Sequence, residues 1–304
     1  MDVLVQIILG ACLGELFLGK KIGALGALWG VVVAVVPSLA QVAVAAFPVG
    51  DHIVFHQDIC HSLLFAGLGA PVLGRCLTGL NPNAHLSWRA WSLWALWVLL
   101  GVTLLQCFTV DGAPLFWPFN DYRLVLGSIL IIDPLYAIPM LVGLLTALYF
   151  HRASCERQVA NILGFLLSTL YVGFTLINQW QVYTIFETSL RNQGHGHYER
   201  LFVYPVSVNN VGWIGMAEDA QGVWVGYYYA DNRNQPVTFQ HFGNDHTILV
   251  TLLEGAAYRR LFGLFGGFHG WREPAGVLLD RDNASAVKKR LMLIERRQDI
   301  AGLS

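Results

Sequence analysis

Long apolar runs alternate with short polar connections over the first 180 residues of the chain. A helix needs roughly 20 predominantly apolar residues to cross the hydrocarbon core of a bilayer. The pattern therefore predicts six membrane-spanning helices, at about 3–19, 23–47, 62–79, 88–108, 124–149 and 159–180. Glycines lie four residues apart in the first two of them, at Gly10 and Gly14 and at Gly26 and Gly30. This spacing favours close helix packing, although glycine is also simply common in membrane helices.

The pattern changes after residue 180, where ordinary surface composition begins. Segments rich in Val, Tyr, Phe and Trp predict strands at 201–208, 211–217, 223–229 and 237–242. Helical spacing of apolar residues follows at 248–261, and a basic amphipathic helix, resting on headgroups or in water, at 284–297. The predicted fold is an α-helical bundle of about six transmembrane helices (residues 1–180), followed by a small α+β, mostly antiparallel β, water-facing domain (residues 181–304).

The composition supports a membrane protein and narrows the class of partner. The 304 residues are 55% hydrophobic and 13% charged, with a net charge of −1, whereas soluble domains carry about a quarter charged residues. Near-neutral charge without a basic stripe argues against nucleic acid as a partner, and membrane lipid is the expected one. The segment that begins at Met1 lacks the basic residues of a cleaved signal peptide, so we expect the first span to be retained.

Basic residues are distributed unequally between the connections, and this predicts the orientation. The connections after the second and fourth spans contain only Arg123. Those after the first, third and fifth spans contain six basic residues, namely Lys20, Lys21, Arg75, Arg89, Arg152 and Arg157. Short loops rich in Lys and Arg stay in the cytoplasm. We therefore expect a multi-pass protein of the inner (cytoplasmic) membrane with its C-terminal domain outside the cytoplasm.

A cluster of imidazoles and carboxylates lies between the second and third spans. It contains His52, His56, Asp58 and His61. These side chains suit zinc or another divalent metal, and they equally suit proton transfer. On a helix His52 and His56 would share a face, whereas an extended loop would let His56 and His61 converge. The alternative is that these histidines cap helix ends and bind headgroups or backbone.

Two aspartates are candidates for a catalytic role. Asp111 follows the fourth span on the same side as the histidines, and Asp133 precedes Pro134 inside the predicted fifth span. A proline there would kink the helix, and an acid beside a kink is either a functional group or the partner of a neighbour such as Arg123. The polar residues within the spans must each find a partner, because facing lipid is costly; they are Glu15, Gln41, Gln106, Asp133 and Gln179.

Several motifs follow one another in a characteristic order over most of the chain, namely Met1-Asp2, Gly10-Ala11, Leu18–Gly23, His56-x4-His61-Ser62, Thr109-x2-Gly112, Trp117-Pro118-Phe119-x3-Arg123, Ile131–Tyr136 and Asn178–Phe186. In these motifs and their order the chain resembles the family of LexA-regulated, inner-membrane-bound metal-dependent hydrolases of bacteria. That family is distantly similar to zinc-dependent phospholipase C, which implies hydrolysis of a phosphodiester or lipid headgroup at the outer face of the inner membrane.

The resemblance also implies roles for the candidate residues. His56 and His61 would be metal ligands, completed by Asp58 or His52. Asp111 or Asp133 would orient a ligand or act as the general base. Zinc or another divalent metal would be the cofactor.

The chain departs from the family at the expected ligands. It has Ser38 and Ala40 where members have two aspartates, and Val102 and Gln106 where members have His and Asp. A catalytic zinc site needs about three protein ligands, so the loss points to an alternative. This is a degenerate, non-catalytic member that lacks the metal and serves as a membrane scaffold or as a lipid- or partner-binding protein. A small transporter is a weaker third reading.

Overall fold

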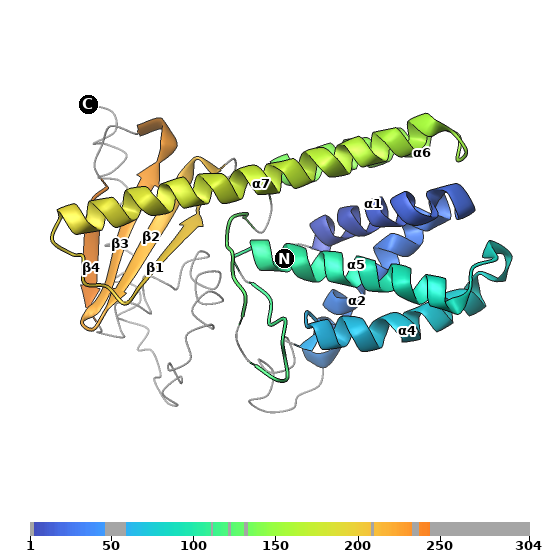
Figure 1. The fold of residues 1–304 in the computed structure, drawn as a ribbon, viewed down its shortest axis with the longest axis horizontal. Helices are drawn as coiled ribbons and strands as arrows, with labels where there is room; N and C mark the ends of the chain where they lie inside the picture. The colour runs from blue at the N-terminus through green and yellow to red at the C-terminus, as the bar shows by residue number, and fades with distance from the viewer. Residues whose placement is uncertain are drawn as a thin grey trace, which may run out of the picture. The chain divides into compact units, whose positions relative to one another are not determined.

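The computed structural model describes residues 3–45, 59–110, 112–120, 123–130, 133–207, 210–232 and 237–243. Its helices are α1 (Val3–Ile22), α2 (Ala24–Ala45), α4 (Leu63–Leu80), α5 (Trp88–Phe108), α6 (Pro134–Tyr149) and α7 (Cys155–Asn192) (Figure 1). Among the described residues, α1, α4, α5 and α7 are long and apolar enough to cross a membrane, and α6 and the segment Ala24–Ala40 of α2 are shorter apolar helices. The predicted apolar helical region is confirmed.

Glycine contacts hold α1 and α2 together, as their spacing predicted. A Cβ added to Gly10 would overlap the carbonyl of Gly30, and one added to Gly14 would overlap the carbonyl of Gly26. The turn between the two helices passes through Gly23 at φ +66°, a conformation that favours glycine. Close backbone approach is the usual packing mode where lipid provides no hydrophobic driving force between helices.

The fifth predicted span is wrong at its start. Residues 123–130 are not helical, and two β-bridges pair them with the chain that leaves α5, Thr109 with Ile129 and Ala113 with Leu124. Helix α6 begins only at Pro134. The physical reason is that proline suits the first turn of a helix, where its missing N–H is not needed, so Pro134 starts α6 rather than kinking a longer helix.

The helix that contains the sixth predicted span, α7, begins before it and continues without a break to Asn192. Its buried residues follow one face of the helix from end to end: Arg157, Asn161, Gly164, Ser168, Val172, Thr175, Val182, Phe186 and Leu190. The expected domain boundary at residue 180 therefore lies inside this helix. It marks a change of surroundings and not a break in the chain.

Four strands form the sheet, in the order β1 (Arg200–Pro205), β2 (Gly212–Asp219), β3 (Gly222–Tyr229) and β4 (Phe239–Gly243). The pairs β1–β2 and β2–β3 are antiparallel, and the predicted small antiparallel sheet is confirmed. Asp219 makes the hairpin turn by accepting hydrogen bonds from the backbone N–H groups of Gln221 and Gly222, at 2.8 Å each.

The end of α7 covers one face of this sheet (Figure 1). Phe186 is fully buried there and lies directly on Gly215, where a Cβ would overlap its ring. Trp213 and Tyr228 complete this core from β2 and β3. The predicted helices at 248–261 and 284–297 lie outside the described residues.

Candidate functional site

Most of the predicted histidine site lies outside the described residues, including His52, His56, Asp58 and Asp111. His61 is described. It lies in the turn that precedes α4 and is only 5% exposed. The adjacent Ser62 caps α4, since its Oγ accepts a hydrogen bond of 3.1 Å from the Phe65 N–H.

The end of the segment that contains the predicted histidine cluster (residues 52–61, the histidine segment) contacts the chain between α5 and α6. The N–H of Leu63 donates to the carbonyl of Leu115 at 3.0 Å. That chain is folded against the end of α5, because Leu126 N–H donates to Cys107 O at 2.7 Å and Ser128 N–H donates to Phe108 O at 2.9 Å. The sequence predicted that these two segments would lie on the same side, and the backbone contact agrees with it.

Asp133 is the N-cap of α6 and is 2% exposed. Its Oδ1 accepts a hydrogen bond of 3.0 Å from the Leu135 N–H, and its Oδ2 accepts one of 2.8 Å from the Tyr171 hydroxyl. The expectation of an acid beside a kink is therefore corrected. Both carboxylate oxygens have structural partners, as a buried carboxylate requires.

The bonds around Asp133 continue to the β domain. Asn210 Nδ2 donates to the Tyr171 hydroxyl at 3.2 Å, and the carbonyl of Asn210 accepts from Asn178 Nδ2 at 3.1 Å and from Trp213 Nε1 at 2.9 Å. Asn210 has φ +56°, a conformation that asparagine tolerates better than most residues. Sequence reasoning missed Tyr171 and Asn210, and the Asn209-Asn210 dipeptide was the only signal available for the turn.

Gln179 ties three segments together where α7 meets the sheet. Its Nε2 donates to Leu126 O at 2.7 Å and to Val203 O at 3.0 Å. These carbonyls belong to the chain before α6 and to β1. The prediction that Gln179 must find a polar partner is confirmed.

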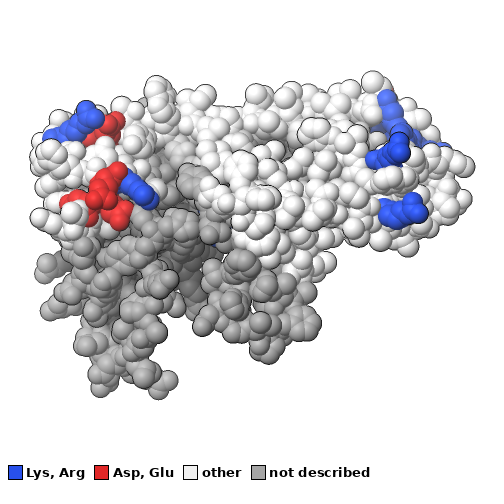
Figure 2. All heavy atoms as spheres, turned by 60° about the horizontal axis from the view of Figure 1, so that its bottom comes forward, with Lys and Arg blue, Asp and Glu red and all other residues white. Residues whose placement is uncertain are grey.

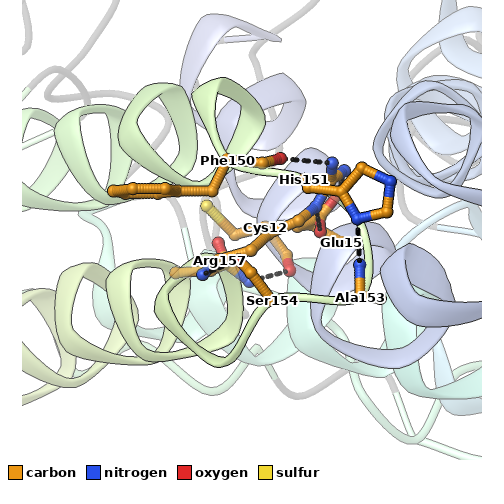
Figure 3. Close-up of polar contacts among 8 residues, drawn as sticks. Cys12, Glu15, Phe150, His151, Ala153, Ser154 and Arg157 are labelled. Atoms are coloured by element: carbon orange, nitrogen blue, oxygen red, sulfur yellow. Dashed lines mark hydrogen bonds and ion pairs between the residues drawn. The ribbon is translucent and has the colours of Figure 1, made fainter.

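Glu15 also has a partner, at the other end of the helical region. Arg157 donates from Nε to Glu15 Oε1 at 2.6 Å and from Nη2 to Oε2 at 2.7 Å (Figure 3). The side chains are 6% (Arg157) and 3% (Glu15) exposed. Arg157 also donates to the carbonyl of Phe150 at 3.2 Å. Arg157 therefore belongs to the packed interior between α1 and α7, and it should not be counted among the free loop cations.

An aromatic cluster lies beside the β2–β3 turn. The ring of Trp224 stacks on the ring of His195, with 3.7 Å between the ring centroids, and its centroid lies 4.5 Å from that of His241. The Trp224 Nε1 donates a hydrogen bond of 2.7 Å to Asp219 Oδ2. Burial raises the pKa of the Asp219 carboxyl, but the bonds from Trp224, Gln221 and Gly222 and the nearby His241 outweigh it and lower the pKa below its ordinary value. Nothing in the sequence pattern pointed to this cluster.

The described residues do not fit a three-ligand metal site. No group of three or more His, Cys, Asp or Glu side chains comes together within the described ranges. Two positions where the family resemblance implies ligands have structural roles here, since Ser38 Oγ donates to Gln6 Oε1 at 2.6 Å and Val102 is fully buried in the core. Gln106 occupies a third such position, where it is buried and its Oε1 has no hydrogen-bond partner among the described residues.

Comparison with known proteins identifies the family of the helical region. A family model described as YdjM inner membrane protein matches residues 1–182 of the 304. No curated protein and no solved structure matches the chain. The match agrees with the inner-membrane family indicated by the motifs, and it says nothing of metal or hydrolysis. The chain therefore belongs to the YdjM inner membrane protein family.

Proposed function

We propose that this protein is a non-catalytic member of its family that anchors a small β domain in the inner membrane and holds it rigidly for binding to a partner outside the cytoplasm. The observation that carries the proposal is the continuity of α7. A helix of 38 residues is about 57 Å long, whereas the hydrocarbon core is about 30 Å thick. The second half of α7 therefore extends beyond the bilayer and forms one core with the sheet.

Two further features support a rigid carrier. Gln179 and the bonds between Asp133, Tyr171 and Asn210 join the sheet to the helical region at more than one point. Asp133, one of the two aspartates predicted to be catalytic, is buried in these bonds. The basic turns lie at the opposite end of the helices, which favours placing the sheet outside the cytoplasm.

Limited proteolysis of the detergent-solubilised protein tests the rigid connection. We expect the wild type to resist cleavage between residues 178 and 212, and Gln179→Ala to become sensitive there. Gln181→Ala is the matched control, because Gln181 is exposed on the same turn of α7. Equal sensitivity of the wild type and Gln179→Ala would contradict the proposal. A reporter fused after Ser304 should be active outside the cytoplasm, and a cytoplasmic signal would contradict the orientation.

A metal-dependent hydrolase acting on a phosphodiester or lipid headgroup is the second candidate. One observation favours it: the bond from Leu63 to Leu115 brings the end of the histidine segment against the chain that follows Asp111. The metal, zinc or another divalent ion, would need ligands from His56, His61 and Asp58 or His52.

Metal analysis of the purified protein separates the two candidates. The hydrolase requires near-stoichiometric zinc or manganese, lost in both His56→Ala and His61→Ala but kept in His151→Ala, which changes an exposed histidine in the turn between α6 and α7. The rigid carrier requires that protein purified under metal-replete conditions contain no stoichiometric metal and that a chelator leave its melting temperature unchanged.

A further inference from the structure

Helix α4 has one buried face and one open face. Its buried residues are Ala66, Ala70, Gly74 and Leu77, which lie on the side that faces α5. The approach is close at Gly74, where a Cβ would overlap Ser92. On the other side Leu68 is 66% and Val72 is 63% exposed. Lipid is therefore the expected neighbour along most of this open face.

A groove interrupts the open face near the end of α4. It is shallow and open to its surroundings, with a volume of about 430 Å³. Its lining residues are Pro71, Val72, Arg75, Cys76 and Trp88. The four residues from α4 occupy two successive turns, and Trp88 closes the groove from the first position of α5. The surface that lines the groove is almost entirely apolar, and Arg75 is the one charged residue among those that line it.

The groove lies at the basic end of the helical region. Trp29 Nε1 donates to Asn81 Oδ1 at 3.0 Å, which ties the α4–α5 turn to α2. A Cβ on Gly23 would lie 4.0 Å from the Arg152 side chain, which ties the α1–α2 turn to the α6–α7 turn. Exposed cations gather at this end, namely Lys20, Lys21, Arg75, Arg89 and Arg152 (Figure 2).

Negative charge is scarce around the groove. Residues 59–110, which include all of α4 and α5, contain no Asp or Glu. The one exposed acid in the described turns at this end is Glu156. Arg89 stacks on Trp88, with its Cζ 5.7 Å from the ring centroid, and so adds a second cation beside the groove. Arginine binds phosphate oxygens well, and basic pockets between membrane helices on the cytoplasmic side bind anionic headgroups.

We propose that this groove binds an anionic phospholipid, with an acyl chain along Val72 and Leu68 and the headgroup phosphate at Arg75. Trp88 fits the same place, because tryptophan is enriched where the bilayer meets water. A second copy of the chain is the other occupant to consider. A symmetric α4 contact would bring two Arg75 side chains together with no acid to separate them, so the charges favour lipid. The site is independent of the function proposed above.

Lipid titration of the delipidated protein tests the site. The probes are phosphatidylglycerol and phosphatidylcholine with identical acyl chains, and binding is measured by native mass spectrometry. We expect the wild type to bind phosphatidylglycerol more tightly, and Arg75→Gln to weaken that binding about fivefold. Arg152→Gln is the matched control, because it removes an exposed cation at the same end but outside the groove, and it should change binding less than twofold.

A second variant tests the apolar part of the groove. Val72→Trp fills it without a change of charge, and we expect it to weaken binding of both lipids. Bound phosphatidylglycerol should also slow maleimide labelling of Cys76, which is exposed in the groove. Equal affinity of the wild type for the two lipids would overturn the proposal, as would an equal loss in Arg152→Gln. Efficient Cys76–Cys76 crosslinking that persists in excess lipid would assign the groove to a second copy.

Discussion

The ion pair between Glu15 and Arg157 allows a quantitative prediction, because it is buried, bidentate and joins two helices distant in sequence. Its two bonds are 2.6 and 2.7 Å long, and the side chains are 6% (Arg157) and 3% (Glu15) exposed. Removing one partner of such a pair leaves an unpaired buried charge, which costs about 3–5 kcal/mol. We therefore expect Glu15→Gln to lower the free energy of unfolding by that amount.

Each single variant should leave one buried charge without its partner. In Glu15→Gln the guanidinium of Arg157 stays charged, because arginine does not lose its proton in proteins. Arg157→Gln should also lower the free energy of unfolding, and the exchanged pair Glu15→Arg with Arg157→Glu should recover part of the loss.

The assay is unfolding in mixed micelles, by titration with a denaturing detergent and detection by tryptophan fluorescence. The matched control is the exposed pair of Glu187 and Arg191 on the same helix α7, joined at 2.7 Å with side chains 31% (Glu187) and 67% (Arg191) exposed. Breaking it should cost about 0.5 kcal/mol or less. If Glu15→Gln costs no more than Glu187→Gln, burial does not decide the strength of these pairs and the reasoning is refuted.

Gly14→Leu should push α1 away from the backbone of Gly26 and lower the free energy of unfolding by about 1–3 kcal/mol. Gly67→Leu should leave that free energy almost unchanged, because an added Cβ there meets nothing within 4 Å. Similar losses in the two variants would contradict the contact between α1 and α2. Tyr171→Phe should lose about 1–3 kcal/mol, because Asp133 Oδ2 loses its donor, and the exposed Tyr149→Phe should have no effect in the same titration. The pKa of Asp219 is lower in the folded protein than its ordinary value of 3.8. The carboxylate therefore contributes fully to stability above pH 3.8, and this contribution is lost as the pH falls through the folded-state pKa. In an acid titration the NMR signal of the Trp224 indole N–H should report this protonation, and Asp219→Asn should abolish the change.

Much of the fold could be predicted because it depends on local patterns. Apolar length located the helices, and the glycine spacing identified the contact between α1 and α2. The alternation of Val, Tyr and Trp located all four strands to within a few residues. The hairpin turn at Asp219 also depends on local chemistry, since aspartate favours this turn by accepting hydrogen bonds from the backbone N–H groups that follow it.

The errors occurred where one local signal permits two structures. A proline after an acidic residue fits both a kink and a helix start, and only the bridges between 109–113 and 124–129 decide for the start at Pro134. The span at 159–180 was predicted from the length that a bilayer needs, whereas Val182, Phe186 and Leu190 continue the helical spacing beyond it. That spacing was the missed signal for the length of α7.

The site could be predicted less well, because partners far apart in sequence are brought together by packing alone. Glu15 and Arg157 are 142 positions apart, and Tyr171 and Asn210 are 39 apart. No periodicity relates such pairs. The sequence correctly required a partner for each of Glu15, Asp133 and Gln179, but it could not name that partner. The metal-binding roles predicted for His52, His56, Asp58 and His61 and the catalytic roles predicted for Asp111 and Asp133 remain predictions.

The buried residues of α7 lie on one face, so this helix sets the rotation of the sheet about the helix axis relative to the helical bundle. Asn161 and Ser168 face the bundle and Phe186 faces the sheet from the same side of one helix. Inserting one residue between Thr175 and Val182 would turn the sheet by about 100° and separate every contact at once, whereas inserting seven would leave it only about 20° out of phase. Natural or engineered variants should therefore change the length of this helix in steps near seven residues, which would move the sheet away from the bilayer without rotating it.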